Sequence, residues 1–188
     1  PRTVAAHCIY LSEAEIDGWA SHGVSIAHCP GSNLKIEARI PPIHRLMGAA
    51  SIGIGTDWAA SDNAMDMLVE TRLAAMAGKM KADDPTALPV ATMLRLATIE
   101  GARVLGLDAQ IGSVEIGKRA DLVVFDLDLP EASPRHDLRA NLLYSMSVRS
   151  VRDVMVDGRL LVRNHELEAD LAALKAEIAR REKIWRAA

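Results

Sequence analysis

The amino-acid sequence predicts an α/β protein whose first part is a sheet of parallel strands covered by helices. Two observations predict this class. Three short apolar runs, at residues 3–8, 24–29 and 51–55, alternate with segments of helical pattern. The runs are apolar at consecutive positions, which is typical of strands buried on both faces of a sheet. Strands and helices that alternate in this way form parallel βα units.

The first helix is expected over residues 12–21 and has recognisable ends. Ser12 suits the N-cap, Glu15 follows three positions later as in a capping box, and Gly23 suits the C-cap. A second helix is expected over residues 41–50, where two consecutive prolines favour the first turn. These two helices would connect the three strands.

Two longer helices are expected after the third strand, over residues 64–80 and 89–105. The Asp-Asp-Pro sequence at 83–85 separates them, because these residues interrupt a helix. Asp62 and Asp66 lie where negative charge interacts favourably with the N-terminal end of the first of these helices.

The pattern changes to short strands and turns from residue 111 onward. Strand-like segments lie within 111–129 and 151–162, and the Asp-Gly pair at 157–158 is a strong signal for a β-hairpin turn. The last segment, 166–185, has apolar residues at near-helical spacing with charged residues between them. This pattern predicts an amphipathic helix whose apolar stripe is a packing surface.

The composition excludes several classes of function. The 188 residues carry a formal net charge of −3 and only 3% are aromatic, so the sequence offers neither a basic surface nor stacking side chains for nucleic acid. No apolar run approaches the roughly 20 residues that span a bilayer. We therefore expect no nucleic-acid partner and no membrane association.

Two cysteines are too few for a disulfide framework, which indicates a reducing, cytoplasmic compartment. The sequence begins with proline and has no apolar leader. We therefore expect either a processed chain or a piece of a longer polypeptide.

Side chains suited to catalysis or metal binding lie at the end of each predicted strand. These are His7, His28 and Asp57. Ligands of parallel βα proteins gather at the carboxyl ends of the strands, so three such residues in succession indicate a functional site. One strand-end histidine alone is more often a buried packing residue. Asp57 follows a glycine-rich strand, and a buried carboxylate there needs a cation or several donors to stay ionised.

Three other motifs are weaker. Each cysteine follows a histidine, which suggests a Cys2His2 zinc site, but neighbouring residues of one strand point to opposite faces. The Ser-x-x-Lys at 32–35 and the Ser-Asp-Asn at 61–63 suggest acyl transfer by a serine, but the Lys-Thr-Gly element is absent and both motifs are expected in loops. Gly53 and Gly55 lack the further residues of a dinucleotide fingerprint.

The sequence strongly resembles the C-terminal half of the amidohydrolase superfamily. The similarity runs from Thr3 to about Asn164 and is carried by five stretches in order: AAHCIYLSEAEI, GVSIAHCPGSNLKI, IGIGTDWAASDNAMDM, ATIEGARVLGL and IGSVEIGKRADLVVFDLD. Within the superfamily it is most similar to the methylthioadenosine/adenosylhomocysteine deaminases and the related s-triazine hydrolases and guanine deaminases. Trp58 departs from the pattern, because these deaminases usually carry a small residue after the metal-binding aspartate.

The resemblance implies a metal-dependent (β/α)8 TIM barrel flanked by a β-sandwich, with the three predicted strands as barrel strands 6 to 8. We expect residues 1–107 to form part of the barrel catalytic domain and residues 108–165 part of the β-sandwich. Residues 166–188 would form the C-terminal amphipathic helix.

The resemblance also implies roles for individual residues. Asp57 matches the strand 8 aspartate, which binds the metal and accepts the proton of the attacking water. His7 matches the strand 6 histidine, which hydrogen-bonds that water or the developing oxyanion. His28 and Asn33, in the HCPGSN stretch, match positions with a structural or loop-positioning role.

We expect the loop after Asp57 to line the floor of a substrate pocket. Trp58 is a candidate ring-stacking wall, with packing under the loop as the alternative, and Ser61 is a candidate polar contact. The implied reaction is hydrolytic deamination of an aminated heteroaromatic ring, such as an adenosine derivative, guanine or an s-triazine.

The implied cofactor is one divalent metal, zinc in the first place and iron as the alternative. Zinc lowers the pKa of its bound water, so that hydroxide attacks the amino-bearing carbon and ammonia leaves. The His-x-His pair and the later barrel histidine of the family are absent, which leaves Asp57 as one ligand of four.

We therefore expect a full-length parent enzyme that acts on a small molecule, while the 188 residues alone are inactive. A complementing N-terminal half would supply the other ligands. The alternative is an inactive truncated fragment that forms a homo-oligomer or binds a partner through the edge of its first strand.

Overall fold

A computed structural model describes residues 3–186 of the chain. Its first sheet contains three parallel strands in the order β1-β2-β3, as the sequence predicts: β1 (Val4–Ala6), β2 (Ser25–His28) and β3 (Ile52–Ile54). Residues 1–2 and 187–188, which belong to the first and last predicted segments, lie outside the described residues.

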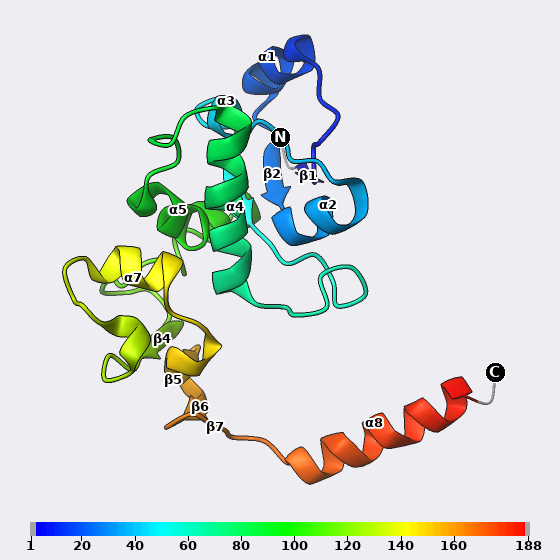
Figure 1. Cartoon of the computed structure of the whole chain (residues 1–188), viewed down its shortest axis with the longest axis vertical. Helices are drawn as coiled ribbons and strands as arrows, with labels where there is room; N and C mark the ends of the chain where they lie inside the picture. The colour runs from blue at the N-terminus through cyan, green and yellow to red at the C-terminus, as the bar shows by residue number, and fades with distance from the viewer. Residues whose placement is uncertain (1–2, 187–188) are drawn as a thin grey trace.

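Six helices connect these strands or follow them (Figure 1). In chain order they are α1 (Glu13–His22), α2 (Pro30–Glu37), α3 (Ile43–Leu46), α4 (Met67–Ala82), α5 (Val90–Leu96) and α6 (Ile99–Leu105). The buried core lies where β2 and β3 meet α3, α4 and α5, and it includes Ile26, Ile43, Leu46, Ile52 and Met93. Burying one such side chain stabilises a fold by roughly 1.5–3 kcal/mol.

Helix α1 has the predicted ends. Ser12 accepts a hydrogen bond from the backbone N–H of Glu15, and the Glu15 carboxylate accepts one from the backbone N–H of Ser12 at 2.7 Å. Gly23 ends the helix with a φ of 60°. A reciprocal cap and a left-handed C-cap are strong local signals, which is why the sequence defines this helix well.

Three helical segments differ from the prediction. Helix α2 begins at Pro30, inside a stretch expected to be a loop, because proline is well suited to the first turn. The helix expected over 41–50 shortens to α3, since the chain becomes extended at Met47 and Gly48 has a φ of 93°. The helix expected over 89–105 is divided into α5 and α6, because Thr98 leaves the helical region.

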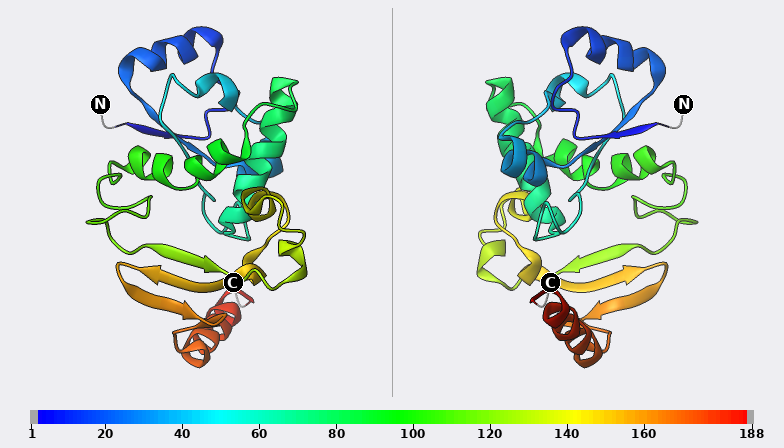
Figure 2. Two further views of the ribbon diagram at one scale, coloured as in Figure 1. Left: turned by 90° about the vertical axis from the view of Figure 1, so that its left-hand side faces the viewer. Right: turned by 90° about the vertical axis from the view of Figure 1, so that its right-hand side faces the viewer.

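The second sheet is antiparallel in the order β4-β5-β6-β7: β4 (Leu122–Phe125), β5 (Val151–Val156), β6 (Arg159–Arg163) and β7 (Glu166–Leu167). The two sheets lie apart, at different levels of the molecule (Figure 2). The predicted hairpin joins β5 and β6, and Asp157 and Gly158 both have positive φ, as a type I′ turn requires.

Between β4 and β5 the chain forms three short helical elements that the sequence analysis does not predict. They are η1 (Pro130–Ala132), α7 (Leu138–Tyr144) and η2 (Val148–Ser150). Asp137 caps α7 by accepting from the backbone N–H groups of Arg139 and Ala140. Leu143 of α7 is buried in the core beside α4 and α5, so tertiary packing holds this short helix.

The tail helix α8 (Leu171–Arg186) begins five residues later than expected. Asp170 accepts from the backbone N–H groups of Ala172 and Ala173 and fixes the start, while residues 166–167 form β7. The helix extends away from the rest of the chain (Figures 1 and 2), and Leu174, Ile178 and Trp185 are exposed. The expected packing of its apolar stripe is therefore not found within residues 3–186. In the same range, no helix combines the length and apolar character needed to cross a membrane.

Candidate active site

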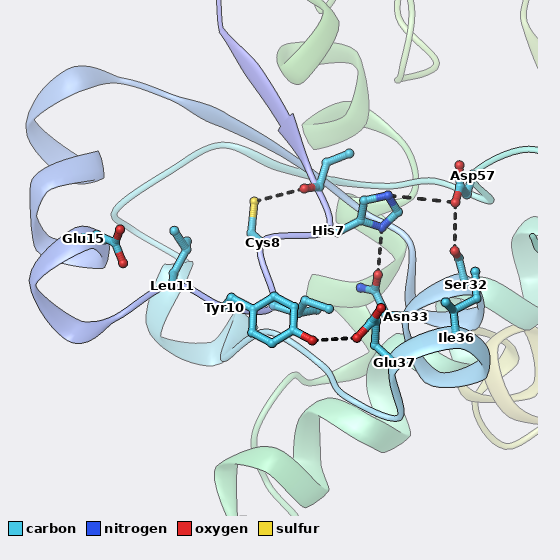
Figure 3. A pocket seen from close by; sticks show the side chains of 12 residues that line it. His7, Cys8, Tyr10, Leu11, Glu15, Ser32, Asn33, Ile36, Glu37 and Asp57 are labelled. Atoms are coloured by element: carbon cyan, nitrogen blue, oxygen red, sulfur yellow. Dashed lines mark hydrogen bonds and ion pairs between the residues drawn. The ribbon is translucent and has the colours of Figure 1, made fainter.

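The carboxyl ends of β1 and β3 bring His7 and Asp57 together. His7 Nε2 lies 3.9 Å from Asp57 Oδ2 (Figure 3). Both residues come shortly after a strand and have left-handed backbones, with φ values of 67° and 62°. This conformation is uncommon for residues other than glycine, and such outliers cluster at functional sites.

Asn33 fixes the imidazole of His7. His7 Nδ1 lies 2.8 Å from Asn33 Oδ1. Because an amide oxygen only accepts, Nδ1 carries the hydrogen, and Nε2 of the neutral ring keeps its lone pair. That nitrogen points toward Asp57 (Figure 3), where it can accept a proton or return one.

Two hydroxyl groups fix the carboxylate of Asp57. Ser61 Oγ donates to Asp57 Oδ2 at 2.7 Å and Ser32 Oγ donates to the same oxygen at 2.8 Å. These bonds, that of Ser61 first, hold the pKa of Asp57 below its ordinary value, because they favour the ionised carboxylate. Asp57 is therefore an ionised base at neutral pH.

A pocket of about 580 Å³ opens beside this pair. His7, Ser32, Asn33 and Asp57 are among the residues that line it, together with Tyr10, Leu11, Ile36 and Glu37. Tyr10 Oη donates to Glu37 Oε2 at 2.5 Å (Figure 3). The pocket therefore combines titratable groups with aromatic and aliphatic surface, as ligand sites in proteins do.

Sequence reasoning missed Ser32 and Tyr10 as members of this site. The Ser-x-x-Lys motif around Ser32 suggests acyl transfer instead, and the place of Ser32 beside Asp57 depends on the early start of α2. Tyr10 lies three residues after His7, beyond the predicted strand, and no sequence pattern singled it out.

Trp58 and Ser61, the two candidate substrate contacts, differ in exposure and in their relation to Asp57. Trp58 is 70% exposed and is not among the residues that line the pocket, so it does not pack under the loop. Its contact with a substrate stays a prediction. Ser61 is buried and its hydroxyl donates to Asp57, so in this structure it positions the carboxylate.

His28, at the end of β2, is completely buried. Neither of its ring nitrogens has a hydrogen-bond partner among the described residues. Burial, with a smaller contribution from His7, lowers the pKa of His28 to about 3. The imidazole is therefore uncharged and is enclosed by the fold.

The described residues do not by themselves form a metal site. Across residues 3–186, no three histidine, cysteine or acidic side chains converge closely enough to hold an ion. Asp57 offers one ligand where zinc takes four. Burial raises the pKa of Cys8 and of Cys29 to about 11, so neither thiol is disposed to bind as a thiolate.

The serine motifs do not form an acyl-transfer site either. The Ser-x-x-Lys segment lies on helix α2 and not in a loop, contrary to expectation. Lys35 Nζ donates to the carbonyl oxygen of Ser61 at 2.7 Å and to Asn63 Oδ1, whereas Ser32 donates to Asp57. The lysine therefore connects α2 to the loop after β3 instead of activating a serine.

Comparison with known proteins finds similar chains along nearly the whole sequence. Residues 1–161 match the profile of the amidohydrolase family. The 5-methylthioadenosine/S-adenosylhomocysteine deaminase of Desulforudis audaxviator is 45% identical over 165 residues, which are 87% of this chain and 38% of that protein.

Two solved structures are similar as well. An adenosine deaminase from Xanthomonas campestris with bound zinc is 43% identical, with a TM-score of 0.94 over 98% of this chain and 43% of that chain. An atrazine chlorohydrolase from Arthrobacter aurescens, complexed with zinc, is 30% identical, with a TM-score of 0.85 over 94% of this chain and 40% of that chain. The chain thus spans about two fifths of the length of these relatives.

Proposed function

Because this chain belongs to the amidohydrolase family, we propose that it forms part of the active site of a hydrolytic deaminase. The observation that carries the proposal is the meeting of His7 and Asp57 on one pocket wall, where side chains of α2 hold both. The relatives named as deaminases of adenosine compounds favour an adenosine derivative as substrate. Guanine and an s-triazine are the alternatives.

In the proposed reaction, a water oxygen bonds to the amino-bearing ring carbon, the C–N bond breaks and the amino group leaves as ammonia. Ionised Asp57 takes a proton from the water and passes it to the leaving nitrogen. His7 Nε2 forms a hydrogen bond with the water or with the oxygen that develops from it. A well-placed general base contributes typically a factor of about 10² to 10⁴ to the rate.

A larger barrel would complete this site. We assign β1, β2 and β3 to strands 6, 7 and 8 of a (β/α)8 barrel and the second sheet to part of a β-sandwich, with divisions near residues 107 and 165. The edge of β1 supports this assignment, since among the described strands β1 pairs only with β2. An unpaired strand edge favours pairing with a further strand.

A divalent metal belongs to the proposal for the complete enzyme. Two of the solved relatives contain zinc, which supports zinc as the metal of the complete enzyme. Asp57 would be the ligand from this chain. The other ligands would come from residues outside the sequence, so we expect the 188-residue chain alone to be inactive.

A chimera tests the proposed function. This chain replaces the matched 165 residues of the Desulforudis audaxviator deaminase, and ammonia release from 5-methylthioadenosine is measured. We expect an active chimera in which Asp57→Asn and His7→Gln each lower kcat, Asp57→Asn by at least about 100-fold because the base is lost.

Asp17→Asn is the matched control, because it removes an exposed carboxylate on α1. It should leave ammonia release unchanged. Full activity of the Asp57→Asn chimera would refute the role of Asp57. A folded, zinc-loaded chimera that releases no ammonia would instead favour the alternative, an inactive chain that binds a partner.

A further inference from the structure

A buried carboxylate beneath the site takes no part in the proposed chemistry. Glu70, in the first turn of α4, is only 1% exposed. Its Oε2 accepts a hydrogen bond from the backbone N–H of Gly31 at 2.8 Å, whereas its Oε1 is buried without a hydrogen-bond partner among the described residues. An ionised oxygen in that position would be costly, because nothing replaces the water it has lost.

A second carboxylate lies against the first. A Cβ atom placed on Gly31 would overlap with Glu70 Oε1 and would lie 3.3 Å from Asp62 Oδ1. Both carboxylates therefore lie next to the backbone of Gly31. Two carboxylates that share one site do not both ionise readily. A proton on Glu70 would replace this repulsion by a hydrogen bond donated to Asp62, and this interaction contributes to the raised pKa of Glu70.

The charges around Glu70 favour its protonated form. Burial first, and then Asp62 and Asp66, raise the pKa of Glu70 to about 7, while the N–H of Gly31 opposes the rise. Lys35, on the neighbouring α2, extends to Ser61 and Asn63. It is therefore engaged with the loop.

Glu70 touches two segments that carry site residues. Gly31 lies in the first turn of α2, and the next residue, Ser32, donates to Asp57. Asp62 follows Ser61, which donates to the same carboxylate, and it also accepts from the backbone N–H of Met65. Lys35 joins α2 to the loop at one end, and the carboxyl pair joins them at the other.

We propose that protonated Glu70 is a positioning residue that joins the start of α2 to the loop after Asp57 and so keeps Ser32 and Ser61 on the Asp57 carboxylate. The joining of the two segments is a property of this chain alone. Its effect on catalysis rests on the proposed function. Ionisation of Glu70 places two negative charges side by side and loosens the contact between the loop and the start of α2.

Carboxyl NMR and amide hydrogen exchange of the 188-residue chain test the joining directly. The Glu70 carboxyl should titrate near pH 7. Because this pKa lies above that of the open form, protection of the Gly31 amide should fall as pH rises from 5 to 7, by up to about tenfold per pH unit, and level off above.

Glu70→Gln should keep that protection at all pH values, since its amide donates to Asp62 and accepts from Gly31 without titrating. Asp62→Asn should return the Glu70 titration toward its ordinary range. Glu182→Gln, which changes an exposed side chain on α8, is the matched control and should keep the wild-type pH dependence. Titration of Glu70 near 4.5, or a Glu70→Gln protein with the wild-type pH dependence, would overturn the proposal.

The chimera tests the consequence for the reaction. Glu70→Gln should keep kcat, and Glu70→Ala should lower kcat roughly tenfold with little change in KM, since it disturbs the base and not the ring contacts. An active chimera in which Glu70→Ala leaves kcat unchanged would refute the positioning role alone. An inactive wild-type chimera would count against the proposed function, while the exchange experiment would still decide the joining of the two segments.

Discussion

At the scale of single residues, surroundings and not residue type decide which side chains carry charge. Asp57 accepts from two hydroxyl groups, which lowers its pKa, whereas Glu70 is buried against another carboxylate and its pKa rises to about 7. His28 lies at the end of β2, the middle strand of the first sheet. It is enclosed without a hydrogen-bond partner among the described residues, and its pKa falls to about 3. The same fold thus holds an ionised carboxylate, a carboxyl group whose pKa is raised and a neutral imidazole.

We predict that His28→Leu stabilises the chain at pH 7 by about 1 kcal/mol, because it removes two buried nitrogens that lack hydrogen-bond partners. The pH dependence follows from the lowered pKa. The unfolded chain binds a proton at His28 below pH 6.5, and the folded chain does so only near pH 3. Wild-type stability should therefore fall as pH decreases from 6.5 toward 3, and the variant should lack this part of the decline.

Urea unfolding at pH 7.5, 6 and 5 measures this difference. His136→Gln, which alters an exposed histidine, is the control and should follow the wild-type curve. A His28→Leu protein that unfolds more easily than wild type at pH 7.5 would show that His28 has a hydrogen-bond partner, such as a buried water.

The sequence leads to His7 and Asp57 because strand ends in parallel βα units are a known place for ligands. It does not lead to Ser32, whose contact with Asp57 requires that α2 begin at Pro30. Nor does it lead to Glu70. An acidic residue in the first turn of a helix is typical of a solvent-exposed charge near the helix dipole, and only the packing of α4 on α2 buries it.

At the scale of elements, strand β3 and helix α6 approach each other through glycine. A Cβ atom on Gly53 would lie 2.8 Å from the Cα atom of Gly101, closer than side-chain atoms normally come to backbone. We predict that Gly53→Ala costs about 1–3 kcal/mol in the free energy of unfolding, because α6 must move away from the sheet.

Gly18→Ala is the matched control, since nothing lies within 4 Å of the added methyl group. Gly18 lies inside α1, where alanine favours the helix by roughly 0.5–1 kcal/mol, so this variant should be more stable than wild type. Thermal unfolding of the two variants should therefore shift in opposite directions. Equal shifts would contradict the close approach of β3 and α6.

Elements with strong local signals are the ones that the sequence predicts. The capping box of α1 and the Asp157-Gly158 turn involve neighbouring residues only, and the structure confirms both. Helix α7 is different, since Leu143 packs against distant parts of the chain. The late start of α8 reflects the cap at Asp170 and the pairing of residues 166–167 with β6.

At the scale of the whole molecule, apolar surface is left uncovered between the two sheets. A cavity of about 1100 Å³ between the two sheets is lined mostly by apolar residues, and Leu105, Val114 and Val123 on its border are exposed. Together with the unpaired edge of β1, this surface favours association. Patterning alone does not show what covers an apolar run, because the run looks the same whether its neighbour is present or absent.

We predict that the 188-residue chain, 20.3 kDa in mass, forms an oligomer on its own and a one-to-one complex when it is co-expressed with the unmatched part of the Desulforudis audaxviator deaminase. The partner would pair with β1 and cover the apolar cavity, and the ligands it brings would allow zinc to bind beside Asp57. Light scattering after size-exclusion chromatography gives the mass of each species, and metal analysis gives the zinc content. Asp57→Asn should leave the complex intact but lower its zinc content, because the variant loses a ligand and no packing contact. A stable 20.3 kDa monomer that does not bind the co-expressed part would show that the edge of β1 needs no further strand. That result would refute the barrel assignment.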